Sequence, residues 1–205
     1  MQCTLCSTQL QEKIDAEYYD CSVCRALVKD TTLYPNEENE KLRYLTHNND
    51  VNDPGYQKFT SPITNYILEH YSKDHLGLDF GSGTGPVISK MLEESGYHIL
   101  QYDPYFANYP ENLEQTYDYL AVCEVAEHFY DPRKEFKRLH GLLNENGSLV
   151  IMTHLFEDGL DFKTWYYRND PTHVFIYRKE TFAYICKEFG FSEFLVEKRL
   201  IVLKK

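Results

Sequence analysis

Two pairs of cysteines near the start of the chain have the spacing of a metal site. Two residues lie between the cysteines of each pair, and fourteen residues separate the pairs, which are Cys3, Cys6, Cys21 and Cys24. Each short loop brings two sulfurs to one point, so the two loops can close a tetrahedron of thiolates around Zn²⁺. The usual zinc template has at least about fifteen residues between the pairs, so this one falls one residue short. Since four sulfur ligands leave no position for water, we expect a structural Zn²⁺ rather than a catalytic one. The alternative, a thioredoxin-like redox pair, needs a βαβ context that neither pair has.

A second group of residues with chemical potential lies where a short apolar segment meets a run of glycines. The segment is Leu76–Phe80, and the run is Gly81-Ser82-Gly83-Thr84-Gly85. Glycine lets the backbone turn sharply and approach a ligand without a Cβ in the way. The spacing differs from the G-x-G-x-x-G of dinucleotide sites, and the absence of a following Lys-Ser/Thr excludes a P-loop. The pattern predicts a nucleotide-binding edge between a strand and a helix.

Two carboxylates flank this glycine turn. Asp79 precedes it, and Asp103 ends the next predicted strand, eighteen residues after Gly85. A carboxylate at that strand end can accept hydrogen bonds from both hydroxyls of a ribose. The alternative for Asp103 is a simple strand-end turn formed with Pro104.

The elements that must position these residues alternate from position 75 to the C-terminus. We expect strands at 76–80, 97–102, 117–122 and 148–152, then two short ones around Phe194 and at 200–203. Helices are expected after the glycine turn, at 132–143 and at 179–189. This alternation predicts an α/β fold with a mostly parallel sheet covered on both faces, its last two strands antiparallel.

The residues before this region are expected to be helical. The segment 37–45 has acidic residues in its first turn, as the helix dipole prefers, and apolar residues recur at helical spacing from Ile63 to Tyr71. Between them, 47–56 is a loop dense in turn-forming residues. The expected division is therefore a zinc-ribbon module at 1–33, a helical cover at 34–74 and an α/β domain at 75–205.

Composition restricts the partners and the compartment. The chain of 205 residues has a formal net charge of −11, which argues against a protein that grips duplex nucleic acid by its phosphates. No apolar run approaches the roughly 20 residues that span a bilayer, and the N-terminus lacks the pattern of a signal peptide. With its cysteines in C-x-x-C pairs or alone in apolar segments, the chain is expected in the reducing cytoplasm.

At this point the sequence resembles a known family. Residues 78–85, Leu-Asp-Phe-Gly-Ser-Gly-Thr-Gly, look like motif I of the class I S-adenosylmethionine-dependent methyltransferases. Residues 123–129, followed by Asp131-Pro132, resemble the E-V-x-E-H segment of their ubiquinone-methylase-like branch, and 142–149 resemble its L-L-K-P-G-G turn. Asn144, Glu145, Asn146 and Ser148 depart from that turn. The whole chain is similar to methyltransferases that carry an N-terminal zinc ribbon.

The resemblance implies a fold, a cofactor and a type of reaction. The fold is a Rossmann-like, mostly parallel seven-stranded sheet with helices on both faces, and the cofactor is S-adenosylmethionine. Asp79 and the glycines would hold its methionine portion, Asp103 its ribose, and the residues after the third strand would border it. The expected cofactor-binding residues are Asp79, Gly81, Ser82, Gly83, Gly85, Asp103, Pro104, Cys123, Glu124 and Val125. For Cys123, packing as a small apolar side chain is the alternative.

A hydroxyl or carbon-acid acceptor would need a general base, and three histidines are candidates. His128 and His154 follow predicted strands, and His173 lies in an aromatic-rich insertion. The pKa of histidine lies nearest neutrality, so any of the three can serve. Each also has a structural alternative: His128 can cap a helix, His154 can be a solvated turn residue, and His173 can be a packed core residue.

The acceptor itself is not named by the sequence. Candidate contacts come from the polar loop, from the E-V-x-E-H segment and from the aromatic insertion; they are His47, Asn49, Tyr56, Glu127, Trp165, Tyr166 and Tyr167. The acidic charge favours a small-molecule acceptor. Two alternatives stay open, an RNA acceptor and a module that binds the cofactor without turnover.

Overall fold

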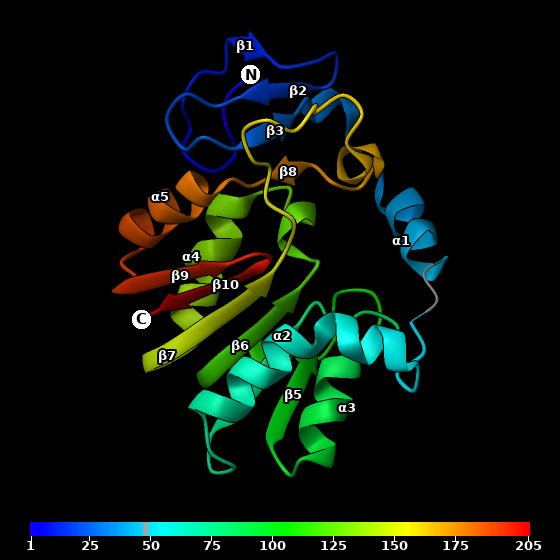
Figure 1. The fold of residues 1–205 in the computed structure, drawn as a ribbon, viewed down its shortest axis with the longest axis vertical. Coiled ribbons are helices and arrows are strands. Elements are labelled where there is room, and N and C mark those ends of the chain that lie inside the picture. Colours follow the sequence, from blue (N-terminus) through cyan, green and yellow to red (C-terminus); the bar gives the residue numbers. More distant parts are fainter. Residues whose placement is uncertain (47–48) are drawn as a thin grey trace.

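The central sheet of the computed structural model, which describes residues 1–46 and 49–205, has six strands in the order β5-β4-β6-β7-β10-β9 (Figure 1). Their bounds are β4 Leu76–Phe80, β5 His98–Tyr102, β6 Tyr117–Cys123, β7 Leu143–Met152, β9 Glu193–Glu197 and β10 Leu200–Lys204. The pairs β4–β5, β4–β6 and β6–β7 are parallel, whereas β10 runs antiparallel to both β7 and β9. The expected Rossmann-like α/β sheet with an antiparallel end is confirmed.

The seventh strand implied by the resemblance is not confirmed, because the described residues form six strands in this sheet. Residues 103–116, which connect β5 to β6, form a turn at Asp103 and the 3₁₀ helix η2, Pro110–Leu113. A crossover that adds a parallel strand needs about a dozen residues before the strand itself. This connection is too short for both, so β5 is an edge strand.

Helices cover both faces of the sheet, α2 (Pro54–His70) and α3 (Val87–Glu94) on one and α4 (Pro132–Leu142) and α5 (Lys179–Phe189) on the other (Figure 1). Successive side chains of a strand point to opposite faces. In β6, Tyr119 and Ala121 belong to the apolar cluster of α2 and α3, whereas Leu120 and Val122 belong to that of α4 and α5. The two cores therefore share one sheet, as the uninterrupted apolar strands predict.

The helices begin where the sequence supplies caps. Helix α1, Glu37–Leu45, follows Asn36, whose side chain accepts a hydrogen bond from the Asn39 N–H at 2.9 Å. Helix α2 begins within the segment expected to be a loop up to residue 56. The carboxylate of Asp53 accepts from the N–H of Gly55 at 2.6 Å, and Pro54 occupies the first turn, where its missing N–H costs nothing. The predicted loop is therefore too long at its end.

The N-terminal residues form a second sheet, in the order β1-β2-β3-β8. Its strands are β1 Glu12–Lys13, β2 Tyr18–Asp20, β3 Leu27–Lys29 and β8 Phe175–Ile176. Elsewhere in the described residues, short 3₁₀ helices occur at η1 Thr31–Leu33, η3 Ala126–His128 and η4 Tyr166–Asn169. Strand β8 comes from the α/β region, so this sheet joins distant parts of the chain. The buried Arg178 reinforces the junction, donating to both carboxylate oxygens of Asp20 at 2.9 and 2.7 Å. Residues 1–33, which carry the four paired cysteines and are called the cysteine module below, lie beyond the ends of β6 and β7 in Figure 1.

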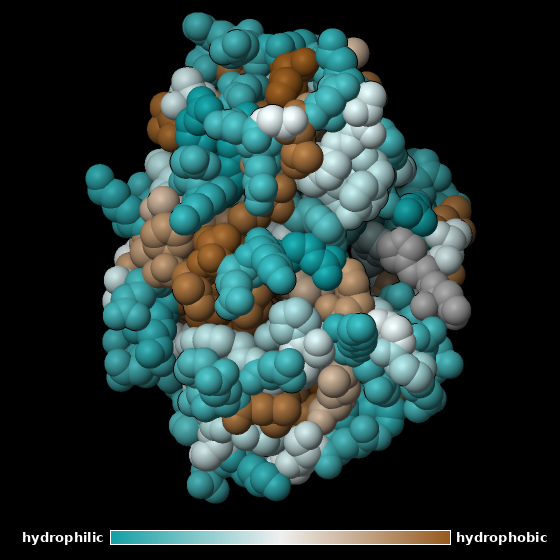
Figure 2. Space-filling model, in the orientation of Figure 1, coloured by the Kyte–Doolittle hydropathy of each residue, from teal (hydrophilic) through white to brown (hydrophobic). Residues whose placement is uncertain are grey.

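The surface is mostly polar on the face drawn in Figure 2, where hydrophobic patches lie between hydrophilic residues. Among the helices of the described residues, none combines the length and the apolar character that a membrane crossing requires.

Two glycine substitutions test this packing with opposite signs. A Cβ on Gly77 of β4 would overlap the ring of Tyr119, which is fully buried and cannot move aside. We expect Gly77→Ala to lower the free energy of unfolding by about 2 kcal/mol. In α4, a Cβ on Gly141 meets nothing within 4 Å, so Gly141→Ala should raise it, by at most about 1 kcal/mol. Urea unfolding measures both, and equal stability of Gly77→Ala and the wild type would contradict the packing described.

Candidate active site

The glycine turn lies at the carboxyl end of β4 and needs its glycines. Gly81 and Gly83 have φ angles of +79° and +64°, in the left-handed region that side chains disfavour. A Cβ on Gly81 would lie 2.5 Å from Cγ2 of Val125, and one on Gly85 would overlap the backbone of Asn49. The Gly81 N–H donates to the carbonyl of Tyr102 at 2.7 Å. The turn therefore fits closely between the ends of the neighbouring strands.

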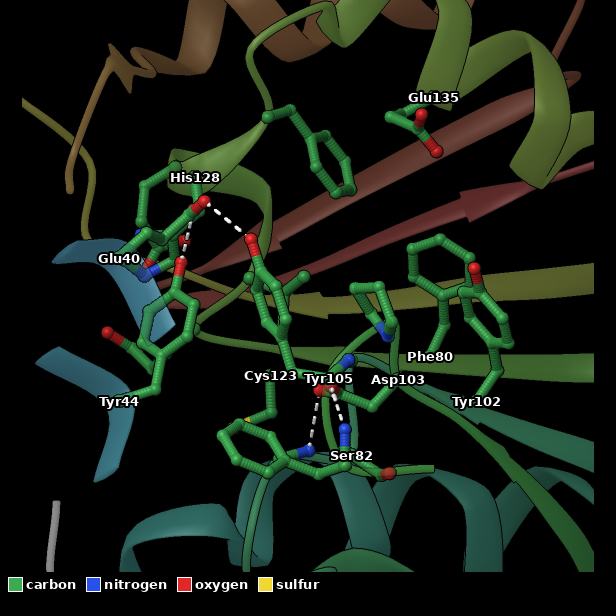
Figure 3. A pocket seen from close by; sticks show the side chains of 18 of the residues that line it. Glu40, Tyr44, Phe80, Ser82, Tyr102, Asp103, Tyr105, Cys123, His128 and Glu135 are labelled. Atoms are coloured by element: carbon green, nitrogen blue, oxygen red, sulfur yellow. Dashed lines mark hydrogen bonds and ion pairs between the residues drawn. The ribbon is translucent and has the colours of Figure 1, made fainter. Parts of the chain in front are cut away.

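Asp103 ties the end of β5 to this turn. Its Oδ2 accepts a hydrogen bond from the Gly83 N–H at 3.0 Å, and its Oδ1 accepts from Tyr105 and Phe106 N–H at 2.8 and 3.0 Å (Figure 3). The carboxylate is only 7% exposed. Two oxygens offer about four acceptor positions, so capacity for another donor remains.

Asp79 lies deeper, beneath the turn. It accepts from the hydroxyl of Ser89 on α3 at 2.9 Å, and burial raises its pKa to about 6, with the Ser89 hydrogen bonds acting against the rise. Asp79 is not among the residues that line the cavity described next. Its contact with Ser89 links β4 to the first turn of α3, so it supports the turn from below.

A cavity of about 700 Å³ opens above the turn. The expected site residues that line it are Asn49, Tyr56, Gly81, Ser82, Gly83, Asp103, Pro104, Cys123, Glu124, Val125, Glu127, His128 and His173. Two of them link the start of α2 and the segment before it to the glycine turn. Asn49 Nδ2 donates to Thr84 Oγ1 at 3.4 Å, and the hydroxyl of Tyr56, in the first turn of α2, donates to the Gly85 carbonyl at 3.5 Å. His47, another expected contact, lies outside the described residues.

Helix α1 closes the cavity through residues that the sequence analysis missed. The carboxylate of Glu40, which is 9% exposed, accepts from the hydroxyls of Tyr44 at 2.8 Å and Tyr105 at 2.9 Å (Figure 3). Tyr105 comes directly after Asp103-Pro104, so its proximity to the turn could have been inferred from the sequence. Glu40 had no such signal, because it looked like one of several acidic residues of a first helical turn.

The residues at the end of β6 form another wall of the cavity, next to the turn. Glu124 has a φ of +51°, and its N–H donates to the Met152 carbonyl at 2.7 Å. Burial, with Glu127 adding to it and Arg199 opposing it, raises the pKa of Glu124 to about 9. Burial also raises the pKa of the Cys123 thiol well above its usual range, so this sulfur is a neutral packing group.

Glu127, His128 and His173 come together at the far end of the cavity. Glu127 is fully buried and accepts from the hydroxyls of Tyr167 at 2.5 Å and Thr153 at 3.0 Å. The rings of His128 and His173 lie 4.9 Å apart between centroids. Burial lowers the pKa of His173, with Glu127 acting against the fall.

His154 and two aromatic residues lie outside the lining of this cavity. Nε2 of His154 is 3.0 Å from Arg199 Nη1 and 3.1 Å from the Tyr166 hydroxyl, and burial and Arg199 lower its pKa to about 4. Trp165 packs in the aromatic cluster of Phe156 and Phe162. Tyr166 is 64% exposed and lines a smaller hollow of about 400 Å³.

Tyr167 acts through Glu127 and not as a wall of the main cavity. Its ring lines the smaller hollow together with His173, while its hydroxyl is committed to Glu127 and Thr153. Of the three histidines expected at the sheet edge, the fold therefore brings two into the cavity and leaves His154 beside Arg199.

Comparisons with known proteins identify the family of the chain. A family model described as a methyltransferase domain matches residues 55–194. One similar solved structure is the 1,6-didemethyltoxoflavin-N1-methyltransferase of Burkholderia thailandensis with bound 1,6-didemethyltoxoflavin and S-adenosylhomocysteine. The match covers 96% of this chain and 99% of that enzyme, with 14% sequence identity and a TM-score of 0.60. Another is a SAM-dependent methyltransferase from Archaeoglobus fulgidus. That match covers 73% of this chain and 94% of the Archaeoglobus chain, with 17% sequence identity and a TM-score of 0.55.

An O-methyltransferase family protein from Burkholderia thailandensis matches 80% of this chain at 12% identity and a TM-score of 0.51, and this chain covers 61% of it. At such identities the likeness shows the fold. Comparison with curated protein sequences gives no match.

The family model spans well over half of the chain and includes the glycine turn, Asp103 and the cavity wall. The chain therefore belongs to the methyltransferase domain family.

Proposed function

We propose that this methyltransferase holds S-adenosylmethionine in the part of the cavity lined by the glycine turn and Asp103, and that it methylates a small molecule bound at the Glu127, His128 and His173 end. The observation that carries the proposal is the buried Asp103 carboxylate, which accepts a hydrogen bond from Gly83 N–H and lines the same cavity as His128 and His173. The division into modules at 1–33, 34–74 and 75–205 remains part of this proposal.

The residues present fit the cofactor. Gly81 and Gly83 have the left-handed backbone conformation that the tight turn needs, and Asp103 retains acceptor capacity for ribose hydroxyls. A volume of about 700 Å³ lies within the usual range for small-ligand sites. When bound, S-adenosylmethionine supplies a methyl group made electrophilic by the sulfonium.

The protein's part in the reaction is to orient the acceptor and exclude water. Orientation of a reacting pair can supply several kcal/mol of the barrier, about 7–11 at best. The Glu40 carboxylate links the hydroxyls of Tyr44 and Tyr105, and so closes the cavity with α1. His128 and His173 are the two candidate histidines that line the cavity, and we assign them to the acceptor.

A small acceptor suits a cavity of about 700 Å³ and the net charge of −11. The structurally similar Burkholderia enzyme is named for its acceptor, 1,6-didemethyltoxoflavin, which is a small molecule. Single-stranded or duplex nucleic acid is typically bound along an extended basic surface, which an acidic chain does not favour.

The cysteine module is proposed to hold a structural Zn²⁺. The four sulfurs lie within 4.8 Å of one another, with Cys3–Cys24 at 3.5 Å and Cys6–Cys21 at 3.4 Å. Tetrahedral zinc with bonds of about 2.3 Å places its sulfurs about 3.8 Å apart. Each pair is followed by a residue in the left-handed region, Ser7 and Arg25, so the two loops repeat one geometry. The donor set suits zinc, and it leaves no open position for chemistry.

Substitution of Asp103 tests the cofactor assignment. Removing the carboxylate in Asp103→Ala should weaken S-adenosylmethionine binding at least tenfold, or about 1.4 kcal/mol, by calorimetry. Asp103→Asn keeps an oxygen that can accept from Gly83 N–H but lacks the negative charge, so this variant separates ribose binding from support of the turn. It should also bind S-adenosylmethionine more weakly than the wild type. Asp158→Ala, which removes an exposed carboxylate outside the cavity, is the matched control. An unchanged dissociation constant in a folded Asp103→Ala protein would contradict the assignment.

The acceptor class can be tested with a labelled methyl donor. We expect label from the enzyme and a cell extract to appear in the low-molecular-mass fraction and to be insensitive to ribonuclease. Label recovered only in RNA would reject the small-molecule proposal, and label in no fraction would favour a module without turnover.

Zinc content tests the cysteine module. We expect one zinc per chain in the wild type and none in Cys3→Ser, with faster amide exchange in residues 1–33 and in β8, because β3 pairs with β8. Cys186→Ser, which removes a thiol that donates to the Phe191 carbonyl outside the four-cysteine cluster, should keep its zinc. A zinc-free wild type with four reactive thiols at these positions would refute the site.

A further inference from the structure

We propose that Glu127, His128 and His173 bind a divalent transition-metal ion at the acceptor end of the cavity. Each residue offers one ligand atom, and these three atoms lie within 4.8 Å of one another. Nε2 of His128 is 4.0 Å from Oε1 of Glu127. Ligands around a tetrahedral ion with bonds of about 2.1 Å lie about 3.4 Å apart, so side-chain shifts of about an ångström close the site.

The two imidazoles are oriented as metal ligands usually are. Nδ1 of His128 lies 2.9 Å from the Thr172 carbonyl, and Nδ1 of His173 lies 2.6 Å from the Tyr167 carbonyl. A carbonyl can only accept, so Nδ1 is the protonated nitrogen in both rings and Nε2 is the coordinating one. Metal-bound histidines typically donate their other N–H to a carbonyl or carboxylate, which fixes the ring and the tautomer.

Glu127 supplies the negative charge. Its carboxylate is fully buried, and within the part of the chain that the structure describes no Lys or Arg comes within 4.0 Å of it. Buried charges are normally paired with an opposite charge or coordinate a metal. The hydroxyls of Tyr167 and Thr153 each bond one oxygen, which fixes the carboxylate and leaves lone pairs for a cation.

Two imidazoles and one carboxylate form a donor set different from that of the cysteine module. Nitrogen and oxygen ligands with open positions suit ions such as Fe²⁺, Mn²⁺ or Zn²⁺, whereas four thiolates select zinc and close its coordination. The three residues line the cavity, and Figure 3 places His128 at its upper end, away from Asp103. The open positions of the ion would therefore face the acceptor.

This placement assigns a chemical class to the acceptor, an inference that rests on the proposed function. An acceptor with a hydroxyl oxygen can bind the ion, which lowers the pKa of that hydroxyl so that its proton passes to water. The oxygen then forms a bond to the methyl carbon while the carbon–sulfur bond breaks and its electron pair stays on sulfur. No other reactant is needed.

Manganese binding to the full chain tests the site. The protein is first treated with chelator, its remaining zinc is measured, and Mn²⁺ is then titrated with free Mn²⁺ read by electron paramagnetic resonance. We expect the wild type to bind one Mn²⁺ per chain, and His173→Gln and Glu127→Gln to bind it at least tenfold more weakly. His154→Gln, which removes a histidine from the same sheet edge but outside the cluster, should bind Mn²⁺ like the wild type.

Binding of S-adenosylhomocysteine in the same samples, without Mn²⁺, shows that each variant is folded and tests the cofactor site separately. Should Glu127→Gln fail to fold, His173→Gln alone decides. Absence of Mn²⁺ binding by the wild type, or equal binding by a folded His173→Gln, would overturn the metal site while leaving the cofactor site intact.

Discussion

The hydrogen bond from Gly83 N–H to Asp103 is the contact on which the arrangement of the site depends. Strands β4 and β5 are parallel neighbours, so their carboxyl ends meet at one edge, and this bond fixes the glycine turn against the next strand end. The same carboxylate accepts from Tyr105 N–H, and Tyr105 in turn bonds Glu40 of α1. A single buried charge thus connects the turn, the strand end and the helix that closes the cavity.

The cysteine module supports the opposite end of the same cavity. Its strand β3 pairs with β8, the Tyr18 hydroxyl donates to the His173 carbonyl at 2.6 Å, and Lys29 donates to the Pro171 carbonyl at 3.0 Å. These contacts hold the segment that carries His173. The module also packs apolar side chains into the cores, with Leu5, Leu27 and Val28 fully buried, and the proposed zinc would hold its two cysteine loops together. A structural metal far from the methyl group would then still affect the acceptor end.

Local signals in the sequence were sufficient for most elements and for the cofactor edge. Helix α5 has the predicted bounds, Lys179–Phe189, because apolar spacing and Gly190 mark it locally. Asp103 and the glycines could be placed because each directly follows a predicted strand, Asp103 after β5 and the glycine turn after β4. Glu40 and β8 could not, since their roles depend on partners distant in sequence, Tyr105 and β3. The seventh strand came from the resemblance alone, and the short 103–116 connection has no room for it.

The central claim is that the cavity lined by the glycine turn and Asp103 binds the adenosine part of the methyl donor. Calorimetric titration of the wild-type protein with S-adenosylhomocysteine measures this most directly, because no acceptor has to be known. The account predicts saturable binding of one molecule per chain, in competition with S-adenosylmethionine. A folded protein that gives no binding heat with either nucleoside at several temperatures would contradict it.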